Sequence, residues 1–157
     1  MINADRLTVK SAEALNDALG IARRNGNPLV YDVHLLAALL AQDEGIVAPL
    51  LHKLGVGVDQ LRERVEREIA RYPKQSDAQP SLSRELNSVF DRADDEARKL
   101  GDEYVSTEHL LLALAEVKGT ESREMLRSVQ VTREALLEAL KAVRGSHRVT
   151  DQTPENQ

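Results

Sequence analysis

The chain has 157 residues, a formal net charge of −5 and no cysteine, and these values already exclude several classes of protein. The length fits one domain that buries roughly two thirds of the surface of its unfolded chain, and a chain without cysteine forms no disulfide, thiolate nucleophile or cysteine metal site. The negative charge argues against nucleic acid as a partner, and apolar residues that are mainly leucine, alanine and valine, without tryptophan, favour an all-α fold.

Apolar residues at helical spacing predict four helices in the first half of the chain. The first starts at Thr8, whose hydroxyl can accept backbone N–H groups, and ends at Gly26, a residue suited to a left-handed cap. Pro28 prevents the helix from resuming. The four expected helices cover about 8–25, 32–44, 47–54 and 59–71.

The second half of the chain predicts four more helices after a connector. Residues 72–81, YPKQSDAQPS, contain two prolines and no apolar periodicity. Ser83 then stands where Thr8 stood, as the cap of a fifth helix. The remaining helices open at Thr107, contain Met125 and Leu126, and open at Thr132. Residues 146–157 are polar and without periodicity, so we expect a linker to a module outside this chain.

The two halves of the chain are copies of one unit. Adding 75 to each number superposes YDVHLLAALLA at Tyr31–Ala41 on STEHLLLALAE at Ser106–Glu116 without a gap, so that His34 falls on His109. One constant shift over almost the whole unit indicates an internal duplication. We therefore expect one domain, 1–145, of eight helices in two pseudo-twofold-related four-helix repeats, repeat one at 7–71 and repeat two at 82–145.

Few residues in the chain suggest catalytic chemistry. His34 and His109 could meet as two metal ligands in a small metal-dependent enzyme, but we favour the interpretation that each packs in its helix or hydrogen-bonds to its own helix N-terminus. The sequence has no HExxH, Walker A or G-x-G-x-x-G motif. We interpret Asp94, Asp95 and Glu96 as a solvated helix edge. No catalytic residue and no metal site is expected.

Positions that differ between the repeats suggest a binding surface. Leu19 corresponds to Asp94 in the second repeat, and Leu15 corresponds to Phe90, the only phenylalanine. These apolar side chains are either covered core residues or the lining of a hydrophobic groove. An exposed groove of this kind suits a binder of unfolded polypeptide, because apolar burial is not specific for sequence.

The second repeat carries a recognisable motif. The stretch 101–114, a glycine cap and a short turn followed by TEHLLLAL, resembles the Clp N-terminal repeat, and the tail at 148–157 is similar to the segment after the N-domain in the ClpB branch of that family. The resemblance implies the same eight-helix fold on a flexible linker above an AAA+ hexamer. It also implies a non-catalytic domain that engages unfolded or aggregated protein through a hydrophobic groove and passes it to an ATP-driven pore.

The resemblance also implies which residues bind substrate and which partners exist. Together with the groove residues, the expected substrate-binding set is Thr8, Leu15, Leu19, Ser83, Phe90, Asp102, Glu108 and His109. No cofactor is expected in this chain, since ATP and Mg belong to the missing modules. The implied domain is monomeric and the implied parent a homohexamer that works with a DnaK-type chaperone system. The alternative is an adaptor-docking N-domain of the ClpA/ClpC type.

The expected location is the cytoplasm. The first ten residues, MINADRLTVK, lack the continuous apolar run of a signal peptide. The longest apolar runs, near Leu35–Ala41 and Leu110–Ala115, are much shorter than the roughly 20 residues that span a bilayer. We therefore expect neither a membrane nor a nucleic acid among the partners.

Overall fold

The computed structural model describes residues 2–145 and 147–154 of the chain. Within them the expected eight α-helices are present, so the all-α prediction is confirmed. A short 3₁₀ helix, η1, and two short strands are additional elements. The bounds are η1 Ala4–Arg6, α1 Val9–Arg24, β1 Leu29–Val30, α2 Asp32–Ala41, α3 Val47–Lys53, α4 Val58–Ala70, β2 Ser81–Leu82, α5 Arg84–Lys99, α6 Thr107–Glu116, α7 Glu121–Ser128 and α8 Arg133–Arg144.

The helix boundaries follow the duplication closely. Shifting α1 and α2 by 75 residues gives the bounds of α5 and α6. The predicted caps are also present, because Thr8, Ser83 and Thr132 each accept a backbone N–H in the first turn of the following helix. Gly26 and Gly101 have φ angles of 71° and 75°, a left-handed conformation that costs glycine little. Both repeats therefore share one set of helix starts and stops.

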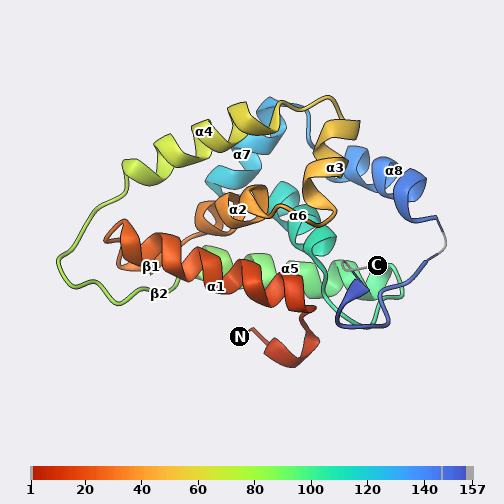
Figure 1. Cartoon of the computed structure of the whole chain (residues 1–157), viewed down its shortest axis with the longest axis horizontal. Coiled ribbons are helices and arrows are strands. Elements are labelled where there is room, and N and C mark those ends of the chain that lie inside the picture. The colour runs from red at the N-terminus through yellow and green to blue at the C-terminus, as the bar shows by residue number, and fades with distance from the viewer. Residues whose placement is uncertain (1, 146, 155–157) are drawn as a thin grey trace.

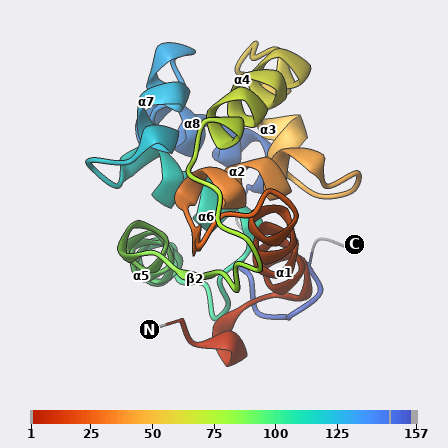
Figure 2. The same cartoon turned by 90° about the vertical axis from the view of Figure 1, so that its left-hand side faces the viewer.

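The helices form three layers, as Figure 1 shows. The long helices α1 and α5 make up the lower layer, α2 and α6 lie in the middle, and α3, α4, α7 and α8 cover the top. In the view of Figure 2 the two repeats face each other across the centre of the molecule. The middle helices are buried on nearly all sides, and their largest fully buried side chains are Leu35, Leu36, Leu39, Leu110, Leu111, Leu112 and Leu114.

The segment that enters each repeat pairs with the other repeat. In the parallel pair of β1 and β2, Val30 lies opposite Leu82. Leu7 and Val105, their equivalents after the shift, form an isolated parallel bridge. The bond from the Ser83 N–H to the Val30 carbonyl, 3.0 Å, has its copy between Thr8 and Val105, 3.1 Å. These pairings were not predicted, because two residues are too few to show a strand period.

The connector and the tail lie at opposite ends of the molecule (Figure 1). The connector, residues 72–80, follows α4, as expected from its composition. The described tail, 147–154, lies against the loop 101–105 and the start of α1. The predicted linker 146–157 remains a prediction, and positions 146 and 155–157 lie outside the described residues. In the described parts of the chain, no helix combines the length and apolarity needed to cross a bilayer.

Candidate functional site

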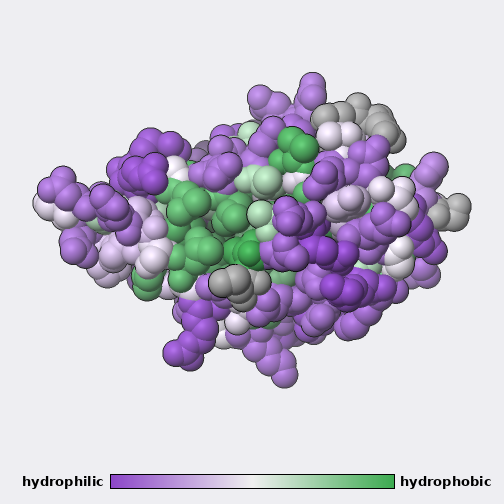
Figure 3. Space-filling view, turned by 90° about the horizontal axis from the view of Figure 1, so that it is seen from below, coloured by the Kyte–Doolittle hydropathy of each residue, from purple (hydrophilic) through white to green (hydrophobic). Residues whose placement is uncertain are grey.

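The face formed by α1 and α5 carries an apolar surface, which Figure 3 shows from below. On α1 the residues that point inward are four apart, Ala14, Ala18 and Ala22, and are fully buried. Leu15 and Leu19 lie on the flank of that stripe and are half-buried. Leu82 of β2 is also half-buried and packs on the same core. We call Leu15, Leu19 and Leu82 the apolar underside.

Phe90 lies deeper than the apolar underside. Its side chain is 5% exposed and belongs to the core. It lines a cleft of about 320 Å³ between α5 and the N-terminal arm, residues 2–7, together with Ile2 and Leu7. Phe90 is therefore a core residue that also lines this cleft, and its role in a hydrophobic groove stays a prediction.

The arm is held to α5 by an ion pair. The Arg6 guanidinium donates from Nη2 to Asp94 Oδ1 at 2.9 Å, and Arg98 donates to Asp94 Oδ2 at 2.9 Å. Burial alone would raise the pKa of Asp94, but the hydrogen bonds from Arg98 and Arg6 outweigh it and hold that pKa below its usual range. Asp94 is therefore a carboxylate that joins the arm to the helix.

The interpretation of the histidines as groups that bond to their own helix N-terminus is confirmed. His34 Nδ1 accepts the Tyr31 N–H at 2.8 Å, and His109 Nδ1 accepts the Ser106 N–H at 2.8 Å. With Nδ1 accepting, the ring proton is on Nε2, which donates to Asn27 Oδ1 at 2.9 Å in repeat one. Burial lowers the pKa of His34 to about 4. Both ring nitrogens of each histidine are therefore engaged within the fold.

Repeat two has a buried charged cluster that repeat one lacks. His109 Nε2 donates to Asp102 Oδ2 at 2.7 Å, and Arg144 donates to Asp102 Oδ1. Arg144 also lies 3.5 Å from Glu108 Oε2, and Ser106 donates to the other oxygen of Glu108. Burial alone would raise the pKa of Asp102, but hydrogen bonds from His109, Arg144 and a backbone N–H hold it below its usual range.

The structure divides the predicted substrate-binding residues into two groups. Leu15 and Leu19 are half-buried and belong to the apolar underside, and Phe90 is a core residue at the cleft next to the N-terminal arm. The other predicted residues are buried and hydrogen-bonded within the fold. Thr8 and Ser83 are helix caps, and the charged cluster contains Asp102, Glu108 and His109. Arg144 was not among the predicted residues, because its position at the end of a helix next to Gly145 indicates only a helix stop.

The interpretation of the acidic triplet as a solvated edge is wrong for Glu96. Its side chain is 1% exposed and accepts two hydrogen bonds from Arg133, at 2.7 and 2.9 Å. Arg92 donates a third, at 3.2 Å. Burial alone would raise the pKa of Glu96, but Arg133 and Arg92 hold it below its usual range. Adjacent acids point to different sides of a helix, and this one points toward α8.

The described residues offer an apolar contact surface and hold no cluster suited to a metal ion. Among residues 2–145 and 147–154, no three His, Asp or Glu side chains gather in a way that could hold a metal ion. The buried carboxylates Glu96 and Asp102 are paired with Arg133 and Arg144, while Leu15 and Leu19 of α1 are only partly covered. The geometry therefore fits a module that binds another polypeptide.

Comparison with known proteins assigns the family. Residues 6–129 match the family model described as the Clp repeat (R) N-terminal domain, and the chain belongs to this family. Clp N-domains are non-catalytic domains of AAA+ chaperones.

Proteins similar to this chain include ClpB chaperones. The chain is 41% identical over 153 residues to the chaperone protein ClpB of Corynebacterium glutamicum, and 42% identical over 150 residues to ClpB of Mycobacterium tuberculosis. These matches cover 96% and 94% of the chain but only 18% of each relative. The chain therefore resembles the N-terminal region of ClpB and spans less than a fifth of the length of those proteins.

Solved structures share the fold. The N-terminal domain of Hsp104 from Candida albicans superposes with a TM-score of 0.81 at 20% identity, covering 95% of this chain and 98% of that one. A ClpV N-domain in complex with a VipB peptide superposes with a TM-score of 0.73 at 22% identity, covering 95% and 91%. The two-repeat architecture is thus that of other Clp N-domains.

Proposed function

We propose that this chain is the client-engaging N-domain of a ClpB-type, ATP-dependent disaggregase, and that it binds apolar segments of unfolded or aggregated protein on its apolar underside. The observation that carries the proposal is the position of Leu15 and Leu19. Both side chains are half-buried on α1 and pack against the core, and the face that α1 and α5 form carries an exposed hydrophobic patch (Figure 3). Such a surface binds by burial of apolar area, which suits clients of many sequences.

The same proposal places the remaining chemistry outside this chain. The parent would be an AAA+ ATPase, assembled as a homohexamer, that binds ATP and Mg in other modules and works in the cytoplasm with a DnaK-type system. The similarity to the N-terminal region of ClpB supports this arrangement. The 157-residue chain itself would bind client without ATP.

The experiment measures binding of a labelled, permanently unfolded model protein by fluorescence anisotropy. Leu19→Ser should weaken binding at least fivefold, because it removes apolar contact area from the underside. Val143→Ser is the matched control, since Val143 is a similar side chain, 48% exposed, on α8. Thermal melts of both variants show that they remain folded. Equal binding by Leu19→Ser and the wild type would place client contact elsewhere.

The alternative is docking of one defined partner, as in ClpA/ClpC-type adaptor recognition. The specific observation in its favour is that a structurally similar ClpV N-domain binds a peptide from one protein, VipB. The anisotropy experiment separates the two functions when a folded Clp adaptor is titrated in parallel. Saturable binding of the adaptor, with no binding of the unfolded protein, would support docking.

A further inference from the structure

The tail of the chain is attached to the domain at several points. Val149 is buried; its N–H donates to Asp102 Oδ1 at 2.7 Å, and its carbonyl accepts from the Glu103 N–H at 2.7 Å. Three residues on, the Gln152 carbonyl accepts from the Val9 N–H at 2.7 Å. We call residues 147–152 the exit strap. It joins the end of α8 to the start of α1.

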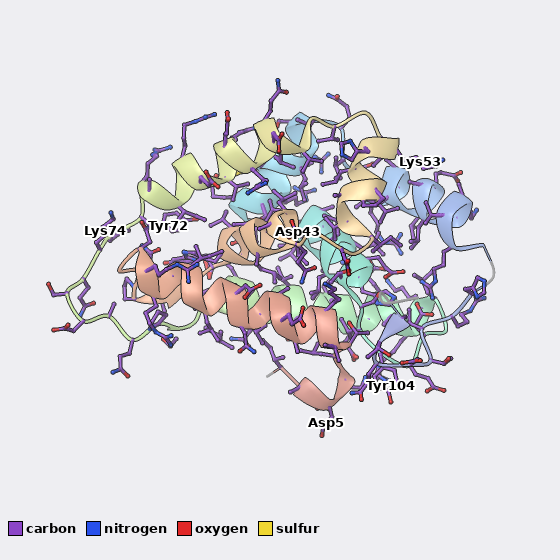
Figure 4. The ribbon with its side chains drawn as sticks, in the orientation of Figure 1. Asp5, Asp43, Lys53, Tyr72, Lys74 and Tyr104 are labelled. Carbon is purple, nitrogen blue, oxygen red and sulfur yellow. The ribbon has the colours of Figure 1, made fainter. Side chains whose placement is uncertain are left out.

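The strap also contacts the N-terminal arm. The Gln152 side chain donates to the carbonyls of Asp5 and Leu7 at 3.4 and 3.5 Å. Figure 4 labels Asp5 and Tyr104 at the end of the molecule where arm, strap and the loop after α5 meet. The Tyr104 N–H donates to the Val149 carbonyl at 3.3 Å. The strap is therefore bonded to the arm on one side and to the loop on the other.

The repeat equivalent of the strap is the connector, and the two are held by different chemistry. Asn27 and Asp102 are 75 residues apart, and each accepts a hydrogen bond from the histidine of its own repeat. The remaining amide group of Asn27 donates to the Pro73 carbonyl at 3.1 Å. The remaining oxygen of Asp102 accepts the Val149 N–H. In repeat one the side-chain amide of Asn27 thus donates to a carbonyl of the connector, whereas in repeat two the carboxylate of Asp102 accepts from an N–H of the strap.

The charged groups around Asp102 belong to this second arrangement. Arg144 donates to Asp102, and its Nε donates to the His147 carbonyl of the strap at 2.9 Å. At the positions equivalent to Glu108 and Arg144, repeat one has Val33 and Ile69. Both equivalents are apolar, so the charged cluster is not required by the fold of a repeat. It is present where the strap is bound.

We propose that Asp102 is the latch of the exit strap, that Arg144 and Glu108 position it, and that this carboxylate sets the direction in which the chain leaves the domain. The proposal is independent of client binding, because none of these side chains lies on the apolar underside. It gives Asp102 and Glu108 a positioning role in place of the substrate contact that the family resemblance implies. This role rests on the parent proposed above, in which a released strap would let the domain turn freely relative to the next module.

The test compares Asp102→Asn with Asn27→Asp, the exchange of the two repeat-equivalent residues, by hydrogen exchange of single amides in NMR. Asparagine at 102 can still accept from His109, as Asn27 does from His34, but it presents N–H to the N–H of Val149. Protection of the Val149, Glu103 and Val9 amides should therefore fall at least tenfold. In Asn27→Asp the same amides should keep their protection.

Buried amides of α6 report whether a variant is folded. If Asp102→Asn lowers protection throughout α6, Val149→Pro replaces it, because proline removes the N–H of the latch without altering the body of the domain. The Glu103 and Val9 amides should then lose protection while α6 keeps it. Wild-type protection of Val9 and Glu103 in a folded latch variant would overturn the proposal.

Discussion

The buried ion pair between Glu96 and Arg133 gives the sharpest test of the energetics of this fold. The equivalent positions in repeat one are Ile21 and Val58, and both of these apolar side chains are partly buried against the core. We predict that Glu96→Ile with Arg133→Val leaves the domain at least as stable as the wild type. Replacing a buried ion pair by apolar residues is often neutral or stabilising, by about 1–4 kcal/mol.

The single variants should behave differently. Arg133→Val leaves a carboxylate whose side chain is 1% exposed with Arg92 as its partner, and we expect a loss of about 3 kcal/mol, the lower end for breaking a buried pair. Glu96→Ile leaves Arg133, whose side chain is 24% exposed and can reach water, so the expected loss is about 1 kcal/mol or less.

The measurement is urea unfolding at pH 7 followed by circular dichroism, for the wild type, both single variants and the double variant. The expected coupling energy is the difference between the summed single losses and the loss of the double variant, about 3–4 kcal/mol. A double variant that loses the sum of both single effects would show that the two repeats do not share one packing scheme at this contact.

Three further predictions concern the capping residues and the core. Burial lowers the pKa of His34 from 6.5 to about 4, so below pH 6.5 the unfolded chain binds a proton that the folded chain does not bind. The free energy of unfolding should therefore fall by about 3 kcal/mol between pH 6.5 and 4. In urea titrations at a series of pH values, His34→Gln, which keeps an acceptor at this position, should show a smaller pH dependence of that free energy. Thr8→Ala and Ser83→Ala should each cost about 1 kcal/mol in thermal melts but leave client affinity unchanged at temperatures where the domain is folded, and weaker binding would restore their predicted contact role. Phe90→Ala should destabilise the domain by about 3–5 kcal/mol, and a loss below about 1 kcal/mol in urea unfolding would show that this ring is not a core residue.

The helices were predictable from the sequence because their signals are local. Thr8, Ser83 and Gly101 mark helix ends by their own chemistry, and the duplication supplied a second copy of every signal. The histidine caps were predictable for the same reason, since each bonds three residues back. In contrast, the pairings between residues distant in sequence could not be predicted.

Glu96 and the tail show why contacts between distant residues could not be predicted from the sequence. Glu96 resembled its acidic neighbours, and its burial depends on Arg133, 37 residues away on another helix. The tail looked like a linker because it lacks apolar periodicity, yet Val149 in its described part is buried and is held by backbone bonds to a distant loop. In the candidate site, the sequence left open whether Leu15 and Leu19 are covered or line a groove, and the structure shows both half-buried, whereas the membership of Arg144 in the charged cluster required the fold.

The segment before the first helix of each repeat pairs with the other repeat, so neither half can make these contacts alone. Val30 finds its partner in Leu82, and Val105 in Leu7, so each half completes a contact that the other half begins. Two separate copies of one half could make the same contacts only by associating, and that association would depend on their concentration. Joined by the connector, the halves meet at a fixed, high effective concentration, so the domain is in essence a dimer made permanent by fusion.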